Sequence, residues 1–367
     1  MACVTPAVPL TRLAACDLDR THSIVGSRWE SLRHGRVFLT GGTGFVGKWL
    51  LATLIDADER LNLQCEITVL TRNPAKFQDA APWLANAPCV TLIPGNVIDF
   101  VFPAGPFTHI IHAATDVAVQ AAPLAVFDTC VMGTRRVLDL ALSSDAGSVL
   151  LVSSGAVYGP QPSLIAAVEE TFGGGPDPLS AAYAYAHGKR AAESLASFYA
   201  AHGLNVKIAR CFAFVGPYLP LDVKFAVGNF IRDAIRGERI IVRGDGTAVR
   251  SYLHASDMAA WLWAALVDGQ QGVAYNVGSS EAVSLENLAL LISNLTESTA
   301  GVAVLGRTAE AATPDRYVPN VSRALAALRV GRPLGLADAL ARTFQWYETS
   351  TFQHHVVQEP QARGPTA

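Results

Sequence analysis

An apolar stretch that runs directly into a glycine-rich turn constrains the fold of this chain most. Residues 36–40 read Arg-Val-Phe-Leu-Thr, and the next seven are Gly-Gly-Thr-Gly-Phe-Val-Gly, followed by an apolar segment with helical periodicity. In a strand, glycine turn and helix of this order, backbone N–H groups at the helix N-terminus bind a pyrophosphate. We therefore expect a dinucleotide site here, formed by Gly41, Thr43, Gly44, Phe45, Val46 and Gly47.

Short apolar runs alternate with longer helical patterns through the first two thirds of the chain. This alternation predicts an α/β fold, a Rossmann-type doubly wound parallel sheet with helices on both faces. The predicted strands lack polar alternation, as buried parallel strands do, and lie at residues 36–40, 66–70, 89–93, 109–113, 148–152 and 205–211. The clearest helices are expected at residues 46–55, 124–142 and 181–202.

The regular alternation of short apolar runs and helical patterns ends near Pro217, and this change predicts a smaller C-terminal lobe. We expect helices at 225–236, 256–266, 285–292 and 336–346 and a short strand at 239–242. Trp261 and Trp263 are assigned to the core of this lobe. The predicted organisation is an N-terminal extension (1–35), a Rossmann NAD(P)-binding domain (36–216) to which some later segments return, a mainly substrate-binding lobe (217–350) and a flexible tail (351–367). The first 20 residues are interpreted as an irregular leader, and roughly the first 25 as dispensable.

The charge balance excludes some classes of partner. Lys and Arg total 28, Asp and Glu total 31, and only 16% of the residues are charged. We therefore expect neither nucleic acid nor an anionic membrane as a partner. No segment is typical of a signal peptide or a membrane span, so a cytoplasmic location is expected. The six cysteines lack metal-ligand spacing, which predicts reduced, mostly buried thiols and no metal site.

The end of the second predicted strand bears on which dinucleotide is bound. An NAD site normally has a carboxylate there for the ribose hydroxyl, whereas this chain has Thr71 followed by Arg72. A guanidinium at this place can pair with a 2′-phosphate, so NADP is favoured and NAD is possible. The alternative is that Arg72 is only a solvated loop cation.

A Tyr and a Lys one helical turn apart indicate acid–base chemistry. Tyr185 and Lys189 share a face of the helix predicted at 181–202. The Lys189 ammonium can lower the pKa of the Tyr185 phenol, which then exchanges a proton with a substrate hydroxyl. Ser154, which follows the fifth predicted strand, would hydrogen-bond the same oxygen. Tyr183 lacks this spacing and is interpreted as wall or core.

Taken together, these motifs resemble those of the extended short-chain dehydrogenase/reductases, the NAD-dependent epimerase/dehydratase family that acts on nucleotide-sugars. The resemblance spans roughly residues 36–345 in the family's order. It rests on TGGTGFVG, SSGAVYG at 153–159, YAHGK at 185–189, RCFAFVGP at 210–217, GDG at 244–246 and YNVG at 275–278. It implies a Ser154–Tyr185–Lys189 catalytic set, cofactor contacts from Asn96, Val97, Ala113 and Ala114, and a nucleotide-sugar substrate. It also implies a homodimer built on the helices predicted at 124–142 and 181–202.

Departures from the family's patterns bear on the reaction. The 4,6-dehydratases have an Asp-Glu pair after the serine, and UDP-glucuronate decarboxylases have a Glu at the second of these positions, where this chain has Gly155 and Ala156. The minimal set of the 4-epimerases is intact, so an epimerase is the expected function. A dehydratase, a keto-sugar reductase and a catalytically idle dinucleotide-binding scaffold stay open as alternatives. Two asparagines that the family commonly uses are replaced by Cys130 and Ala213.

Several further residues are candidates for contacts with the substrate. By resemblance, Arg250 pairs with the substrate pyrophosphate, and Ala213, Asn229 and Arg316 are secondary candidates. For Arg316 a surface ion pair with Asp315 or Glu310 is an equal alternative. His112 is interpreted as a packing residue, His187 as a support near the site, and His354 and His355 as solvated.

Overall fold

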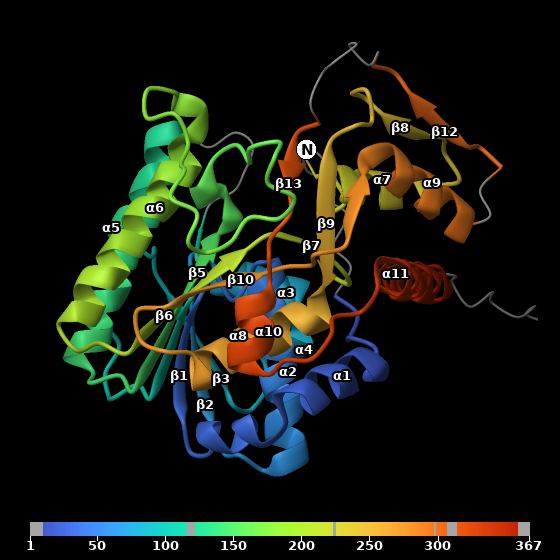
Figure 1. The fold of residues 1–367 in the computed structure, drawn as a ribbon. Coiled ribbons are helices and arrows are strands. Elements are labelled where there is room, and N and C mark those ends of the chain that lie inside the picture. Colours follow the sequence, from blue (N-terminus) through green and yellow to red (C-terminus); the bar gives the residue numbers. More distant parts are fainter. Residues whose placement is uncertain (1–9, 116–121, 223–224, 297–298, 307–313, 359–367) are drawn as a thin grey trace, which may run out of the picture.

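A seven-stranded parallel sheet forms the centre of the computed structural model (Figure 1). The structure describes residues 10–115, 122–222, 225–296, 299–306 and 314–358, with side chains up to residue 350. The strand order is β10-β6-β5-β4-β1-β2-β3, and each neighbouring pair is parallel. The strands are β1 (Arg36–Thr40), β2 (Glu66–Thr71), β3 (Val90–Pro94), β4 (His109–His112), β5 (Ser148–Ser154), β6 (Val206–Cys211) and β10 (Ala274–Val277). The predicted Rossmann-type fold is confirmed, and a seventh strand comes from the YNVG segment.

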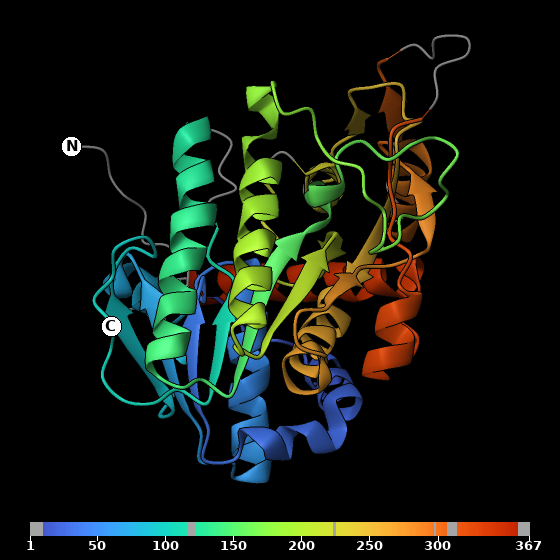
Figure 2. The same cartoon turned by 60° about the vertical axis from the view of Figure 1, so that its left-hand side comes forward.

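Two helical layers cover the sheet. Alternate residues of the buried strands face opposite layers: Phe38 and Val149 belong to one apolar cluster, and Leu39 and Leu150 to the other. Figure 2 shows α5 (Pro123–Ser143) and α6 (Ala184–Ala201) side by side on one face. The other face is covered by α2 (Phe45–Leu61) and α8 (Ala255–Asp268). This double burial explains why the strands carry no polar alternation.

The N-terminal segment corrects one expectation from the sequence. Residues interpreted as an irregular leader form α1 (Ala15–Val25), and η1 (Gly26–Leu32) follows. Trp29 is only 1% exposed and packs against Trp263, with ring centroids 5.5 Å apart. Arg20 forms an ion pair of 2.7 Å with the buried Asp257 of α8. Because α1 buries polar groups against partners far along the chain, its sequence shows no clear apolar stripe.

The assignment of the two α8 tryptophans to the C-terminal lobe is also wrong. Trp261 and Trp263 lie in the apolar cluster between the parallel sheet, α2 and α1. The helix returns to the Rossmann part of the molecule just before β10, and α10 (Ser322–Leu328) packs on both. The almost wholly apolar sequence of this helix indicates that the helix is buried, but it does not indicate which layer covers it.

The remaining elements form a second part with its own apolar cluster. Strands β11, β9 and β13 pair in that order and β7 joins β9, whereas β8 pairs with β12. Their bounds are β7 (Ala213–Val215), β8 (Ile240–Val242), β9 (Val249–His254), β11 (Ala282–Ser284), β12 (Val302–Val304) and β13 (Arg316–Tyr317). The helices here are α7 (Ala226–Ile235), α9 (Leu285–Leu295) and α11 (Leu336–Gln358). Short elements elsewhere are α3 (Pro74–Ala80), α4 (Pro82–Ala85), η2 (Gly155–Tyr158) and η3 (Ala181–Tyr183).

The C-terminal boundary differs from the expected one. Helix α11 continues to Gln358, so the tail expected from residue 351 starts inside a helix. His354 and His355 fall on this last stretch, and their side chains lie outside the described residues.

The described residues include no candidate membrane span and no candidate metal site. No helix there is long and apolar enough to cross a bilayer. No cluster of His, Cys, Asp or Glu there is arranged to hold a metal ion. The described cysteines are free thiols: Cys65, Cys130 and Cys211 are buried, Cys89 is partly buried and Cys16 is exposed, whereas Cys3 lies outside the described residues.

Candidate active site

The glycine turn after β1 forms a tight backbone cradle. Gly41 has φ +74°, and a Cβ there would lie 2.6 Å from the Ala113 carbonyl and the Ala114 nitrogen at the end of β4. A Cβ on Gly47 would lie 2.2 Å from the Gly41 oxygen. Gly44 is the N-cap of α2, and its N–H donates to the Gly41 oxygen at 3.0 Å. The cradle fits a dinucleotide pyrophosphate at the α2 N-terminus, where N–H groups and the helix dipole favour an anion.

The residues predicted to contact the adenosine side of a dinucleotide end β2 and follow β3. Thr71 Oγ1 accepts a hydrogen bond from Asn73 N at 3.3 Å, and Arg72 is exposed beside it. Asn96 Oδ1 accepts from Ile98 N at 3.4 Å. Val97 is buried, and its methyl groups cover Gly133 of α5. The carboxyl ends of neighbouring parallel strands therefore place these residues along one edge of the sheet.

The structure brings Ser154, Tyr185 and Lys189 together at the ends of β5 and α6. Ser154 Oγ accepts from Ala156 N at 3.1 Å, and the Ser154 side chain lies near enough to the Tyr185 hydroxyl to act on its pKa. Lys189 Nζ donates to the Val152 oxygen at 2.7 Å and lies 5.9 Å from the centroid of the Tyr185 ring. Lys189 is 3% exposed and Ser154 6%, whereas Tyr185 is only partly buried.

The electrostatics of this set differ from the expectation at Tyr185. Burial raises the pKa of Tyr185, although the hydrogen bond with Ser154 acts in the opposite direction. Burial also lowers the pKa of Lys189. Desolvation of a phenolate therefore outweighs the expected stabilisation by the ammonium, whose hydrogen bond goes to the β5 backbone.

A second tyrosine, to which the sequence interpretation assigned no role, lies beside the end of β5. The Tyr317 hydroxyl reaches this place from β13. A Cβ on Gly155 would lie 2.7 Å from this hydroxyl and 2.6 Å from Phe212 Cζ. The Tyr317 and Phe212 rings pack with centroids 4.6 Å apart. The missing side chain at Gly155 was visible in the sequence, but the residue that fills its space was not.

Small residues, Cys130 and Ala213, occupy the two positions where the family commonly has asparagine. Cys130 of α5 is 1% exposed, with Sγ 3.6 Å from Thr115 Oγ1. A Cβ on Gly188 of α6 would lie 2.8 Å from the Cys130 Cβ, so the two helices touch here. Ala213 starts β7 and pairs with Tyr252 of β9.

Arg250 lies beside Tyr317, because β9 and β13 pair in register. Its guanidinium donates to Asp315 Oδ2 at 2.5 Å and to the Val249 and Asp315 carbonyl oxygens. The ion pair expected between Arg316 and Asp315 is therefore wrong, since Asp315 pairs with Arg250 instead. Arg316 donates to the Ala166 oxygen at 3.5 Å, and Glu310 lies outside the described residues.

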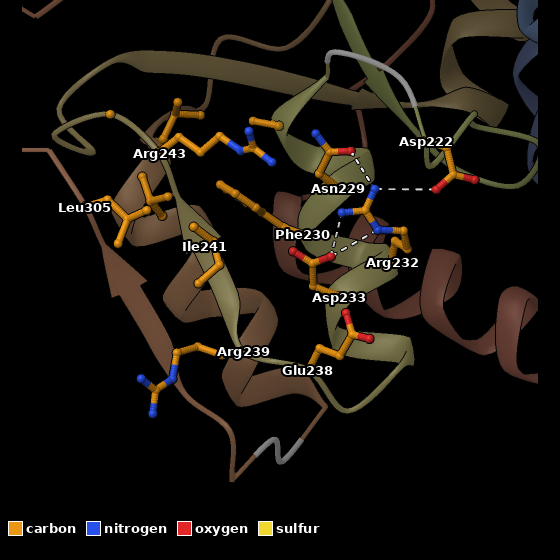
Figure 3. A pocket seen from close by; sticks show the side chains of 14 residues that line it. Asp222, Asn229, Phe230, Arg232, Asp233, Glu238, Arg239, Ile241, Arg243 and Leu305 are labelled. Carbon is orange, nitrogen blue, oxygen red and sulfur yellow. Dashed lines mark hydrogen bonds and ion pairs between the residues drawn. The ribbon is translucent and has the colours of Figure 1, made fainter.

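Asn229, the remaining substrate candidate, lines a cavity of about 940 Å³ between α7 and β8. Figure 3 shows its side chain next to Arg232, which links it to Asp222 and Asp233. The Arg243 side chain extends above Phe230, with its guanidinium directed toward Asn229 (Figure 3). Three arginines and three carboxylates line this cavity together with the Phe230 ring, so its charges are balanced.

Neither histidine near the site is arranged as an acid or base. His112 is buried with ring nitrogens 2.7 Å from Thr40 Oγ1 and 3.1 Å from Thr134 Oγ1, and burial lowers its pKa to about 3. His187 Nε2 lies 3.0 Å from the Asp177 oxygen, so its ring links α6 to the preceding loop.

Comparison with known proteins places the chain in a family. Residues 37–278 match the model of the NAD dependent epimerase/dehydratase family, and the chain belongs to this family. UDP-glucuronic acid decarboxylase 1 of Arabidopsis thaliana is 29% identical over 331 residues, which cover 90% of this chain and 72% of the relative.

Solved structures show the same fold. A dTDP-glucose 4,6-dehydratase of Streptomyces venezuelae, solved with NAD and TYD bound, superimposes with a TM-score of 0.72 at 24% identity, covering 87% of this chain and 98% of that one. A UDP-N-acetylglucosamine 4-epimerase of Methanobrevibacter ruminantium gives 0.73 at 21% identity, covering 87% and 99%. This protein is therefore an enzyme of a nucleotide-sugar-modifying, NAD-dependent family.

Proposed function

We propose that this protein is a nucleotide-sugar epimerase that oxidises a sugar hydroxyl and returns the hydride to the other face of the ketone. The proposal rests on which residues surround Ser154. The set needed for reversible oxidation, Ser154, Tyr185 and Lys189, is assembled. The two following positions, Gly155 and Ala156, offer no carboxylate for elimination, and Tyr317 and Phe212 fill the space over Gly155.

Each residue of the set has a role in the proposed reaction. Tyr185 takes the proton of the sugar hydroxyl and returns one to the oxygen after the second hydride transfer. Ser154 holds the same oxygen by a hydrogen bond, and Lys189 supplies positive charge next to the phenol. The cradle of Gly41, Gly44 and Gly47 would hold the pyrophosphate of a dinucleotide, whose nicotinamide would supply the hydride acceptor and donor. Because both transfers use the same cofactor, no external reductant is consumed.

The cofactor is proposed to be NADP rather than NAD. Two features support this: Thr71 and Arg72 stand where an NAD site has a carboxylate, and Arg72 is exposed at the carboxyl end of β2. A guanidinium there pairs with a 2′-phosphate.

The substrate is proposed to lie along β9 and into the cavity by α7. Arg250 would hold the pyrophosphate through its guanidinium, and Asn229 and Arg243 would contact the nucleoside end. Ala213 and Arg316 are proposed to line the sugar end. The 217–350 region would thereby serve mainly the substrate, and the 36–216 region the cofactor.

The direct test is incubation with a panel of UDP-, CDP-, dTDP- and GDP-sugars, followed by mass spectrometry and NMR of the products. An isobaric product with inverted configuration, formed without added NADPH, supports the epimerase. Loss of water as the main reaction, or consumption of NADPH, would exclude it. A catalytically idle scaffold would convert none of these sugar nucleotides, and none of them would reduce its bound cofactor.

A second candidate is a UDP-glucuronate decarboxylase, because the relatives matched at 28–29% identity carry that name. It begins with the same oxidation through Tyr185. Ala156 stands where these enzymes have a Glu, so another group would have to act in its place. Release of carbon dioxide from UDP-glucuronate in the same panel would establish this candidate.

We also propose a homodimer through α5 and α6. Both helices expose large apolar side chains: Leu124 is 77% exposed, Met132 51% and Phe198 61%. Exposed apolar groups gathered on paired helices are typical of an interface. Sedimentation equilibrium should give twice the monomer mass, and Phe198→Glu should shift the protein toward the monomer.

A further inference from the structure

Two successive turns of α6 are bound to consecutive residues of β5. Lys189 Nζ donates to the Val152 oxygen at 2.7 Å. One turn further along the helix, Glu193 Oε1 accepts from Ser153 Oγ at 2.5 Å. Because residues four apart share one face of a helix, Lys189 and Glu193 both lie on the side of α6 that meets the sheet. The second contact therefore fixes the same stretch of α6 that carries the proposed proton-transfer set.

The carboxylate of Glu193 is held from the neighbouring strand by Arg210. Ser153 and Arg210 are register partners in the pairing of β5 with β6. The Arg210 guanidinium donates to both carboxylate oxygens of Glu193, at distances from 2.7 to 3.1 Å. The two side chains are only 11% and 16% exposed. A forked and largely buried ion pair of this kind fixes geometry and is screened little by solvent.

The other side of the Arg210 guanidinium is fixed as well. Its Nη1 donates to the Tyr158 hydroxyl at 2.9 Å and to the Glu170 oxygen at 3.0 Å, and its carbon lies 4.8 Å from the centroid of the Tyr158 ring. The Tyr158 hydroxyl donates in turn to Asn276 Oδ1 at 2.7 Å. Asn276 is the register partner of Arg210 on β10. The carboxylate on α6 is thus tied to β5, β6 and β10, three adjacent strands of the sheet.

The ion pair also sets the balance of charge around Lys189. Lys189 is 3% exposed, and its hydrogen bond goes to a backbone carbonyl. Burial lowers the pKa of Lys189, and the charge of Glu193 acts in the opposite direction. Without the carboxylate, Arg210 would be an unpaired guanidinium close to the ammonium, and each of two like charges disfavours the charged form of the other.

The other ionisable groups around the Lys189 ammonium do not replace this carboxylate. On α6, the centroid of the Tyr185 ring lies 5.9 Å from Nζ. Thiols of Cys130 on α5 and Cys211 on β6 also act on the ammonium, and burial raises the pKa of Cys211 to about 12. The His112 ring on β4 is neutral near pH 7, because burial lowers its pKa to about 3. The charge that balances the ammonium therefore comes from the carboxylate one turn along α6.

We propose that Glu193 is a positioning residue of the active site, which holds α6 on β5 and keeps the Lys189 side chain charged while Arg210 fixes the carboxylate. This inference rests on the proposed function, in which Lys189 supplies positive charge next to the Tyr185 phenol. Glu193 acts through Lys189 and takes no proton from the sugar. The two members of the ion pair should therefore act on Lys189 in opposite directions.

The test is NMR of protein whose lysines carry carbon-13 at Cε, titrated with pH in the presence of NADP. The chain has five lysines, and Lys189→Arg identifies the Lys189 signal. Glu193→Gln should move the Lys189 titration to lower pH by at least about one unit. Arg210→Gln should move it to higher pH, because the carboxylate then faces the ammonium without its partner. A purely structural role gives no such pair of opposite shifts, and unmoved titrations would overturn the proposal.

Two further variants separate charge from folding. The double variant Glu193→Gln, Arg210→Gln removes both charges, so the Lys189 titration should return to that of the parent. Asp17→Asn is the matched control, because it breaks another buried ion pair, 3.0 Å from Asp17 to Arg342, on the side of the sheet opposite α6. It should lower stability and leave the Lys189 titration in place. A double variant that titrates like Glu193→Gln would show that lost packing causes the shift and would contradict the proposal. If one single variant does not fold, the other and the double variant still decide.

A kinetic measurement distinguishes this inference from the proposed function. With a sugar nucleotide that the parent epimerises, the alkaline limb of kcat/KM should move to lower pH in Glu193→Gln, as the Lys189 titration does. An alkaline limb that stays in place while that titration moves would refute the positioning role. If the parent converts no sugar nucleotide of the panel, the epimerase assignment fails, whereas opposite shifts of the Lys189 signal would still establish the action of Glu193 on Lys189.

Discussion

Replacement of Trp29 tests whether the N-terminal segment is part of the Rossmann core. The side chain is 1% exposed and packs against Trp263. Burying about 200 Å² of aromatic surface at roughly 25 cal/mol per Å² gives an upper value of about 5 kcal/mol. Its indole Nε1 is buried without a hydrogen-bond partner within the described residues, which offsets about 1–3 kcal/mol of this gain. We therefore expect Trp29→Ala to lower the free energy of unfolding by about 3 kcal/mol.

The measurement is urea unfolding followed by far-ultraviolet circular dichroism. Trp29→Phe keeps most of the ring and removes the unpaired N–H, so its loss should stay within about 1 kcal/mol. Leu164→Ala, at a side chain that is 98% exposed, is the control and should change stability by no more than about 0.5 kcal/mol. If Trp29→Ala unfolds at the same urea concentration as the parent, residues 15–32 do not stabilise the sheet and the reasoning fails.

Four further predictions concern the cofactor, the substrate and acid stability. Gly44→Ala should keep the unfolding midpoint but weaken cofactor binding in calorimetry. In Gly47→Ala the new Cβ would lie 2.2 Å from the Gly41 oxygen, so both the unfolding midpoint and the cofactor affinity should fall. A Gly47→Ala variant as stable as the parent would contradict the close approach of α2 to the glycine turn. Arg72→Ala should cost about 1.5–3 kcal/mol in NADP binding and leave NAD binding unchanged, and equal losses would refute the 2′-phosphate contact. Arg250→Ala should raise the KM for the sugar nucleotide without changing cofactor affinity, and Asp315→Ala, which frees the guanidinium, should not raise it. Burial holds the pKa of His112 and His254 at about 3, so below about pH 6.5 the unfolded chain binds more protons than the folded one. The free energy of unfolding therefore falls toward acid by up to about 1.4 kcal/mol per pH unit for each histidine. His254→Gln should reduce this slope in urea titrations between about pH 6 and pH 4, and an unchanged slope would show that His254 is not buried in its neutral form.

The strands of the sheet could be predicted from the sequence because their burial is a local property. A doubly covered parallel strand is apolar at consecutive positions along its middle, and this pattern is visible in residues 36–40 and 148–152 without knowledge of neighbours. The ends were less well predicted. Ser154 belongs to β5, and α2 extends to Leu61, because tertiary contacts continue an element beyond its clearest periodicity.

The candidate site was predicted in part. Ser154, Tyr185 and Lys189 follow from motifs that lie on single elements, and the structure brings them together. The partner of Arg250 was not predicted, since Asp315 reaches it only through the pairing of β13 with β9. The pKa of Tyr185 was predicted in the wrong direction, because desolvation depends on what covers the phenol and not on the spacing to Lys189.

The sequence by itself determined the glycine cradle, the parallel sheet and the Ser-Tyr-Lys set, because each depends on the backbone freedom or side-chain spacing of a short segment. Only the tertiary structure decided that α1 and Trp29 belong to the core and that the Tyr317 hydroxyl occupies the space above Gly155. Both facts join residues far apart in the chain, and each of those residues is locally compatible with an exposed position. Their place is set by close packing between layers, a property of the assembled molecule.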